Sequence, residues 1–287
     1  MSRQPSHRPG RHPEGGGIDG ARPTVSVVVP ARNEADNLPL VLPRIPDWVD
    51  EVILVDGGSH DGTAEAAREV HPGIIVVEQD GSGKGSALRQ GFAAATGDII
   101  VMIDADGSTR PEEIGLFVRA LRDGADFVKG SRFLQGAGTA DISHIRRWGN
   151  AALTKTVRLL FRNQYTDLCY GYNAFWAKYL PLLDLDGDGF EIETMMNVRA
   201  IRAGLHVTEV QSFEEERIHG ESNLHAVSDG LRVLRTIVRE RRTSHGHYIR
   251  RAAGVIRHTP DADQISALRS VPAPVAEDEI PELERTS

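Results

Sequence analysis

Two aspartates separated by one alanine, Asp104-Ala105-Asp106, are the residues of this chain best suited to hold a cation. They follow an uninterrupted apolar run at residues 99–103, which predicts a strand buried on both faces. Alternation along an extended backbone sends both carboxylates to one side, where they repel each other unless a cation lies between or beside them. Ligands bind at strand ends in open α/β sheets, so the pair predicts a cation site there. A solvated Asp-Gly turn is the alternative for these residues alone.

Polar loops also follow two earlier apolar runs, at residues 24–29 and 51–55. The first run ends at Pro30 and the second ends on Asp56-Gly57-Gly58-Ser59. Because the carboxyl ends of parallel strands meet at one edge of a sheet, we expect these loops to share a single cleft with the aspartate pair.

The elements that would position these loops alternate in type along the chain. Strand-like runs occupy residues 24–29, 51–55, 73–77, 99–103 and 126–128, and helical patterns occupy residues 63–70, 83–95, 111–121, 145–161 and about 189–203. Asn33 is expected to cap a short helix after the first strand. Strands that alternate with helices predict an α/β fold with a mostly parallel central sheet flanked by helices.

The ordered set of motifs resembles the nucleotide-sugar-binding half of family 2 glycosyltransferases. The matching segments, which span residues 24–135, are Val25 to Glu34, Val55 to Thr63, Gly83-Lys84-Gly85 and Asp104-Ala105-Asp106. The resemblance implies the GT-A nucleotide-diphospho-sugar transferase fold, in a single domain over residues 23–215. It also implies an inverting hexosyl transfer that depends on Mg²⁺ or Mn²⁺, cations that carboxylates and phosphates suit.

The resemblance also assigns roles to single residues. Asp106 ligates the metal, and Asp104 holds the ribose or the metal shell. Contacts with the nucleotide-sugar are expected from Pro30, Arg32, Asn33, Glu34, Asp56, Lys84, Asp104, Ala105, Asp106, Arg132, Arg217 and Asn223. Two acids often stand in tandem where this chain has Asp56-Gly57, so the choice between a GDP-sugar and a UDP-sugar stays open. Lys84 is expected to face the phosphates, with a solvated lysine as the alternative.

Downstream segments resemble the polyprenyl-phosphate sugar synthases. Residues 166–175 resemble their Asp-x-x-x-Gly-aromatic segment, and residues 217–224 resemble the Arg-x-x-Gly-Glu-Ser-Lys segment of dolichol-phosphate mannose synthases. In that family the arginine and the lysine contact phosphates as a loop closes, a role that falls to Arg217, whereas Asn223 stands where the lysine is usual. Arg132 matches the family's arginine near the phosphates. Without the resemblance, Arg217 would be interpreted as part of a surface ion pair.

A polyprenyl phosphate is the acceptor that this resemblance implies. Its phosphate oxygen is already anionic near neutral pH, so the reaction needs no strong general base. The alternative is transfer to a soluble hydroxyl acceptor with Glu191 or Glu193 as the base. Helix capping and dipole compensation would equally explain both acids. A non-catalytic sugar-nucleotide-binding module is a further alternative, against which the intact pair of Asp104 and Asp106 argues.

Composition restricts the remaining possibilities. The 287 residues include 33 Lys and Arg against 41 Asp and Glu, and the resulting net charge of −8 argues against a general nucleic-acid-binding protein. The single cysteine suits a reducing compartment, and no apolar run approaches the roughly 20 residues that span a bilayer. We therefore expect a cytoplasmic protein, or one bound peripherally to the cytosolic face of a membrane, while the oligomeric state stays open.

Residues 216–258 are expected to form the closing loop and a basic amphipathic helical extension. An apolar stripe and an adjacent basic stripe share this helix, formed respectively by Val227, Leu231, Leu234 and Val238 and by Arg232, Arg235, Arg239 and Arg242. This pattern is typical of a helix on an anionic membrane surface, or of one packed on the domain with a solvated basic side. Residues 1–22 and the acidic residues 259–287 are expected to be disordered tails.

Overall fold

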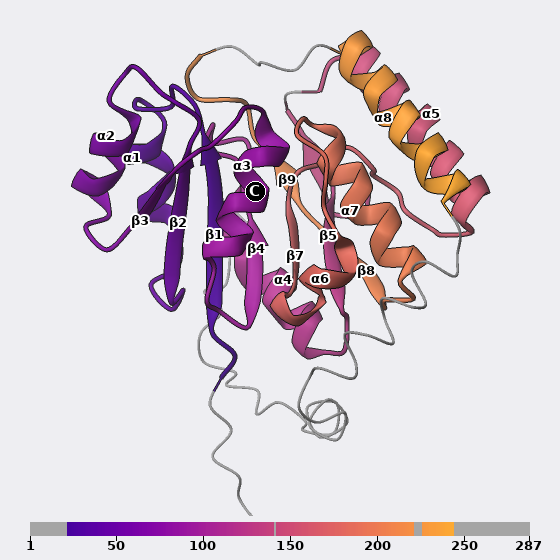
Figure 1. The fold of residues 1–287 in the computed structure, drawn as a ribbon, viewed down its shortest axis with the longest axis horizontal. Coiled ribbons are helices and arrows are strands. Elements are labelled where there is room, and N and C mark those ends of the chain that lie inside the picture. The colour runs from indigo at the N-terminus through magenta and orange to yellow at the C-terminus, as the bar shows by residue number, and fades with distance from the viewer. Residues whose placement is uncertain (1–21, 141, 221–225, 244–287) are drawn as a thin grey trace, which may run out of the picture.

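The structure is a computed structural model that describes residues 22–140, 142–220 and 226–243. A seven-stranded sheet in the order β3-β2-β1-β4-β7-β5-β8 forms its centre (Figure 1). Its strands are β1 (Val25–Ala31), β2 (Glu51–Asp56), β3 (Ile75–Glu78), β4 (Ile99–Met102), β5 (Phe127–Ser131), β7 (Asn173–Trp176) and β8 (Val207–Gln211). A separate two-stranded sheet pairs β6 (Gly138–Thr139) with β9 (Phe213–Glu214).

Parallel pairing dominates the large sheet. β1 lies between β2 and β4 and is parallel to both, β3 is parallel to β2, and β8 is parallel to β5. β7 runs antiparallel to its neighbours β4 and β5. The carboxyl ends of β1, β2, β3 and β4 therefore meet at one edge, and the predicted α/β fold with a mostly parallel sheet is confirmed.

Helices cover both faces of this sheet. One face carries α1 (Leu38–Val41), α2 (Thr63–Val70) and α4 (Ile114–Arg122), and the other carries α3 (Lys84–Ala94), α6 (Leu180–Leu183) and α7 (Glu191–Arg202). Two further helices, α5 (His144–Phe161) and α8 (Ala226–Arg242), lie side by side against α7 as an outer layer (Figure 1). Short 3₁₀ turns are η1 (Leu42–Arg44), η2 (Pro111–Glu113) and η3 (Ala177–Tyr179).

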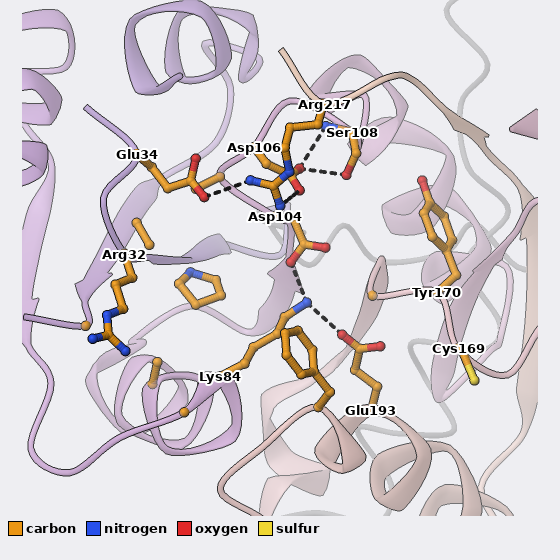
Figure 2. A pocket seen from close by; sticks show the side chains of 18 of the residues that line it. Arg32, Glu34, Lys84, Asp104, Asp106, Ser108, Cys169, Tyr170, Glu193 and Arg217 are labelled. Carbon is orange, nitrogen blue, oxygen red and sulfur yellow. Dashed lines mark hydrogen bonds and ion pairs between the residues drawn. The ribbon is translucent and has the colours of Figure 1, made fainter. Parts of the chain in front are cut away.

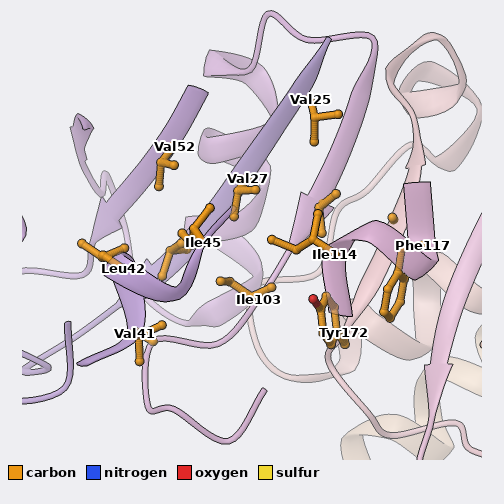
Figure 3. Close-up of a cluster of buried hydrophobic side chains, with 14 of the residues drawn as sticks. Val25, Val27, Val41, Leu42, Ile45, Val52, Ile103, Ile114, Phe117 and Tyr172 are labelled. Atoms are coloured by element: carbon orange, nitrogen blue, oxygen red, sulfur yellow. The ribbon is translucent and has the colours of Figure 1, made fainter. Parts of the chain in front are cut away.

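The first strand shows why the sequence builds a two-sided core. Side chains alternate across a strand, so Val27 joins the cluster beneath α1 and α4, while Val28 joins the cluster beneath α3 and α7. Figure 3 shows the first cluster, in which Val27 lies among aliphatic side chains and Phe117 of α4 stacks on Tyr172 with ring centroids 4.1 Å apart. Burial on both faces explains why valines stand at successive positions 27–29 of this strand.

The expectation that Asn33 caps the first helix was wrong. Helix α1 begins at Leu38, after Asn37, and Asn33 has a left-handed backbone with φ of 56°. Its backbone N–H donates to Ser59 Oγ at 2.9 Å and its side chain accepts from the His60 N–H at 3.0 Å. Asn33 therefore joins the loops after β1 and β2, because its polar groups are bound across the sheet edge.

A buried ion-pair cluster fastens α8 to the rest of the molecule. Arg199 on α7 donates to Glu240 on α8 from Nε at 3.0 Å and from an Nη atom at 2.8 Å. The Glu240 side chain is only 1% exposed, so water does not solvate its charge. The ion pair with Arg199 compensates for that loss of hydration. Of the expected tails, only Arg22 lies among the described residues, where it pairs with Asp50.

We expect Glu240→Ala to lower the free energy of unfolding by about 3 kcal/mol, because it leaves a buried guanidinium short of its partner. Urea unfolding followed by circular dichroism measures the loss. The matched control is Arg119→Ala, which breaks an ion pair with Asp123 whose two side chains are 71% and 66% exposed. That control should change stability by less than about 0.5 kcal/mol. Equal losses in the two variants would contradict a fastening role for Glu240.

Candidate nucleotide-sugar site

The predicted loops converge on one cavity of about 310 Å³ at the carboxyl edge of the sheet. Figure 2 shows Asp104 near its centre, with Arg32 on one side and Tyr170 and Cys169 on the other. Of the twelve residues expected to contact the nucleotide-sugar, eight line it, namely Pro30, Arg32, Glu34, Lys84, Ala105, Arg217 and the two aspartates Asp104 and Asp106. The convergence follows from the topology, because β1, β2 and β4 are neighbouring parallel strands.

Lys84 lies between two carboxylates inside this cavity (Figure 2). Its Nζ atom is 2.5 Å from Asp104 Oδ1 and 2.7 Å from Glu193 Oε1. Burial disfavours the charged ammonium, but the attraction of Asp104 and Glu193 outweighs it and raises the pKa of Lys84. The lysine is thus a permanent positive charge in the cavity, and the alternative of a solvated lysine is excluded.

Arg217 neutralises the second aspartate. One of its Nη atoms is 2.6 Å from Asp106 Oδ2 and the other is 3.2 Å from Glu34 Oε1. Burial, and to a smaller extent the nearby Asp106, raises the pKa of Glu34 against the opposing effects of Asn37 and Arg217. The N–H and hydroxyl of Ser108 both donate to Asp106 Oδ1, which fixes the orientation of the carboxylate. Arg217 is therefore more than a surface ion pair.

The segment 213–219, which carries Arg217, is bound to the backbone of the aspartate turn. The Ile218 N–H donates to the Asp106 carbonyl at 3.1 Å, and the Glu215 N–H donates to the Ser108 carbonyl at 2.8 Å. Gly107 permits this contact: its φ is +81°, and an added Cβ would lie 2.5 Å from Ile218 Cδ1. Because Ile218 packs directly on Gly107, the guanidinium of the preceding residue, Arg217, lies beside the Asp106 carboxylate.

Asp104 and Asp106 offer the oxygen ligands that Mg²⁺ and Mn²⁺ prefer. Within the described parts of the chain, no group of three or more His, Cys, Asp or Glu side chains is arranged to hold a metal ion. A cation here would take its other ligands from phosphate oxygens or water, as Mg²⁺ commonly does in nucleotide sites. The carboxylate oxygens of Asp104 and Asp106 fit such a metal. In this structure the positive charges of Lys84 and Arg217 balance the negative charges of these two carboxylates.

Arg132 lies outside the cavity lining, in the protein interior. It donates from Nε to Asp167 Oδ2 at 2.7 Å and from an Nη atom to Glu214 Oε1 at 2.8 Å. Burial opposes ionisation of Asp167, but Arg132 outweighs it and lowers the pKa of this carboxyl. In this arrangement Arg132 joins β5 to the segment 213–219, and its guanidinium is engaged by carboxylates.

Three other expected residues also lie outside the lining. Asp56 accepts from the Ser59 N–H at 3.1 Å, and the next residue, Gly57, faces the cavity in its place. Glu191 accepts from the Gly189 N–H, whereas Glu193 lines the cavity; residues two apart on a helix project in different directions, which explains the difference. Asn33 lines an adjoining hollow with Arg32 and Arg217. Asn223 is outside the described residues.

The sequence analysis missed several lining residues, among them Arg146 and Gln79. Arg146 enters the cavity from the first turn of α5, and its long separation from the other motifs left no local signal. Gln79 follows β3 directly, so the rule that ligands bind at strand ends could have identified it.

Comparison with known proteins identifies the family. Residues 26–180 match the glycosyl transferase family 2 domain, more than half of the chain. The chain belongs to glycosyl transferase family 2. It is therefore a glycosyltransferase, and the GT-A fold that the sequence implied is confirmed.

Two relatives and one solved structure illustrate this membership. The undecaprenyl-phosphate mannosyltransferase of Micrococcus luteus is 34% identical, with 70% of this chain and 87% of the relative covered. The polyprenol monophosphomannose synthase of Mycolicibacterium smegmatis is 33% identical, with 75% and 88% covered. Glucosyl-3-phosphoglycerate synthase of Mycobacterium tuberculosis, in complex with Mn²⁺, UDP-glucose and glycerol 3-phosphate, superimposes with a TM-score of 0.62 at 26% identity, covering 80% of this chain and 86% of that one.

For this glycosyltransferase we expect Gly107→Ala to displace the segment 213–219. The variant should lose about 1–2 kcal/mol more unfolding free energy than Gly58→Ala, because only at Gly107 does a new Cβ overlap a neighbour. Gly58 is the matched control, since its φ is +73° and nothing lies within 4 Å of an added Cβ. In an Ile218→Ala background the excess should vanish, as a double-mutant cycle would measure. Equal losses at Gly107 and Gly58 would refute the contact.

Proposed function

We propose that this family 2 glycosyltransferase moves a sugar from a GDP- or UDP-linked donor to the phosphate of a polyprenyl phosphate, with Mg²⁺ or Mn²⁺ at Asp104 and Asp106. One observation carries the proposal: a single cavity joins this carboxylate pair to the cationic side chains of Arg32, Lys84, Arg146 and Arg217. Such a lining suits two phosphorylated substrates that meet in one place, with the carboxylates available to a divalent cation.

The donor half of the reaction follows from the contacts of the two central cations. A bound divalent cation supplies charge neutralisation for the nucleoside diphosphate that leaves. Lys84 and Arg217 now hold Asp104 and Asp106, so both stand beside the place where that charge develops. Arg217 has the planar fork of donors that phosphate oxygens accept in pairs. We assign to both residues the task of holding the diphosphate. Solved complexes of the mycobacterial synthase contain Mn²⁺ or Mg²⁺ together with UDP, which supports a divalent cation beside the diphosphate.

The acceptor half depends on which group would remove a proton. A hydroxyl acceptor needs a general base within hydrogen-bonding reach. Glu193 is the carboxylate on α7 that lines the cavity, but its Oε1 is bound to the Lys84 ammonium, while Glu191 lies outside. A phosphate acceptor is already ionised and needs no such base. The names of the Micrococcus and Mycolicibacterium relatives point to the same lipid acceptor.

The outer helices supply a surface for a lipid-linked substrate. Arg146 lines the cavity from the first turn of α5, and the nearby Ile145 and Trp148 are 72% and 78% exposed. On the adjacent α8, Val227 and Leu231 are exposed as well. No described helix has the length and apolar character needed to cross a bilayer. We assign to this face peripheral contact with the cytosolic surface of a membrane.

Metal dependence is tested with Asp106→Asn. We expect transfer to fall by on the order of 10²-fold or more, because the variant removes an anionic ligand while the fold is retained. Sugar transfer is measured after EDTA treatment and again as Mn²⁺ is added back, with Mn²⁺ binding followed by electron paramagnetic resonance. Asp123→Asn, at an exposed site on another loop, is the control and should behave as wild type. Full turnover of EDTA-treated protein would refute the metal assignment.

The lipid acceptor is tested by supplying polyprenyl phosphate in anionic vesicles. We expect the protein to bind vesicles of phosphatidylglycerol at low salt and to dissociate as ionic strength rises, because surface arginines contribute about 1 kcal/mol each and are screened. The double variant Trp148→Ser/Val227→Ser should weaken vesicle binding by about 10-fold, from the loss of apolar area. It should retain transfer to a short, water-soluble prenyl phosphate.

Leu116→Ser is the matched control, since Leu116 is an exposed apolar residue on α4, away from α5 and α8. It should bind vesicles as wild type does. Rapid transfer to a soluble hydroxyl compound, with neither vesicle binding nor lipid-linked product, would support the alternative of a soluble acceptor, as in the mycobacterial synthase whose complexes contain phosphoglyceric acid.

A further inference from the structure

We propose that Asn37 is a positioning residue, which holds the backbone of residues 217–219 so that the Arg217 guanidinium stays at the cavity and binds the diphosphate of the donor. The inference rests on the proposed nucleotide-sugar donor. It goes further by naming a side chain outside the cavity lining that determines where a phosphate-binding cation lies.

Asn37 stands where an asparagine side chain ordinarily serves the local helix. It is the residue before α1, and asparagine at such a position commonly accepts from the backbone N–H two or three residues further along. In the described part of the chain, the Asn37 side chain accepts no such bond. Pro39 has no N–H to donate, and the Leu40 N–H donates to the Asn37 carbonyl at 2.9 Å. The side chain is therefore available for a partner elsewhere in the chain.

That partner is the backbone of His219, 182 residues downstream. Asn37 Oδ1 accepts from the His219 N–H at 2.9 Å, and Asn37 Nδ2 donates to the His219 carbonyl at 3.2 Å. A carboxamide can accept and donate at once, so it pairs with both polar groups of one backbone residue. Asn37 is only 2% exposed, so water competes little for these two hydrogen bonds.

The same carboxamide holds the acidic partner of Arg217. Asn37 Nδ2 also donates to Glu34 Oε2, while Glu34 Oε1 accepts from an Nη atom of Arg217 at 3.2 Å. Figure 2 shows the Arg217 guanidinium between Glu34 and Asp106. The bonds that Asn37 makes end on Glu34 and His219, so they hold Arg217 at the cavity also when Asp106 binds another ligand.

Hydrogen bonds at two successive residues thus fix the backbone next to Arg217. The Ile218 N–H donates to the Asp106 carbonyl at 3.1 Å, which connects the segment to the turn after β4, and His219 is bound by Asn37 in the loop after β1. A segment that is already ordered loses less conformational entropy when a ligand binds, so its contacts yield more affinity. We therefore expect loss of the Asn37 carboxamide to weaken binding of the donor through Arg217.

The test is a double-mutant cycle on calorimetric binding of UDP or GDP, whichever binds wild type more tightly, in the presence of Mn²⁺. Asn37→Asp keeps the acceptor for the His219 N–H but removes both donated bonds, and should weaken binding by about 10-fold. In an Arg217→Ala background the same substitution should weaken binding by less than about twofold, because the cation that Asn37 positions is gone. Asn37→Ala should give the same pattern without adding a charge beside Glu34.

Asn163→Ala is the matched control. Asn163 accepts from the Tyr165 N–H at 2.9 Å and donates to the Val157 carbonyl at 3.0 Å, so its side chain also accepts one backbone bond and donates another. These residues lie outside the cavity lining. The control should bind the nucleotide as wild type does, because its carboxamide holds no segment of the site.

Hydrogen exchange supplies a readout that needs no ligand. The backbone amides of residues 218–219 should exchange at least about 10-fold faster in Asn37→Ala than in wild type, whereas Asn163→Ala should leave their rates unchanged. Unchanged nucleotide affinity in the Asn37 variants, an equal loss with and without Arg217, or an equal loss in Asn163→Ala would overturn the positioning role. Absence of UDP and GDP binding by wild type would instead refute the proposed donor itself.

Discussion

Repulsion between two carboxylates at the end of β4 is the constraint on which the rest of the site depends. Asp104 and Asp106 lie at the edge of a buried sheet, where positive charge must be supplied to them. The fold supplies it from two directions: Lys84 comes from the start of α3, and Arg217 comes from a segment more than a hundred residues downstream. Each cation is itself shared with a second acid, so the centre is a network of alternating charges.

The topology of the sheet makes that network possible. Three parallel neighbours, β2, β1 and β4, bring their carboxyl ends to one edge, and the antiparallel β7 joins this half to β5 and β8. The segment 213–219 follows β8 and returns across the aspartate turn, where backbone hydrogen bonds hold it. Arg132, which follows β5, holds the same segment by donating a hydrogen bond to Glu214. The segment after β8 and the turn after β4 are thus linked through main-chain contacts.

Local patterns in the sequence predicted what local physics determines. The apolar runs located β1, β2 and β4, and the Asp104-Ala105-Asp106 motif located the centre of the cavity, because strand ends and alternation follow from the backbone alone. Residues whose place depends on packing were harder to assign. Whether Arg132 faces a ligand or Asp167 depends on contacts 35 residues apart. The direction of Glu191 and Glu193 depends on how α7 is rotated against the sheet, and Arg146 enters from a separate layer.

The helix α5 touches the cavity at Arg146 and is exposed at Trp148, only two positions further along. Under the proposed function, Arg146 contacts the reacting phosphate groups while Trp148, two residues away, contacts the hydrocarbon of the membrane. The cavity thus lies beside an exposed apolar residue of the same helix. The tail would stay in the lipid while the head group enters. Such an enzyme recognises the head of its acceptor and is indifferent to the number of isoprene units behind it.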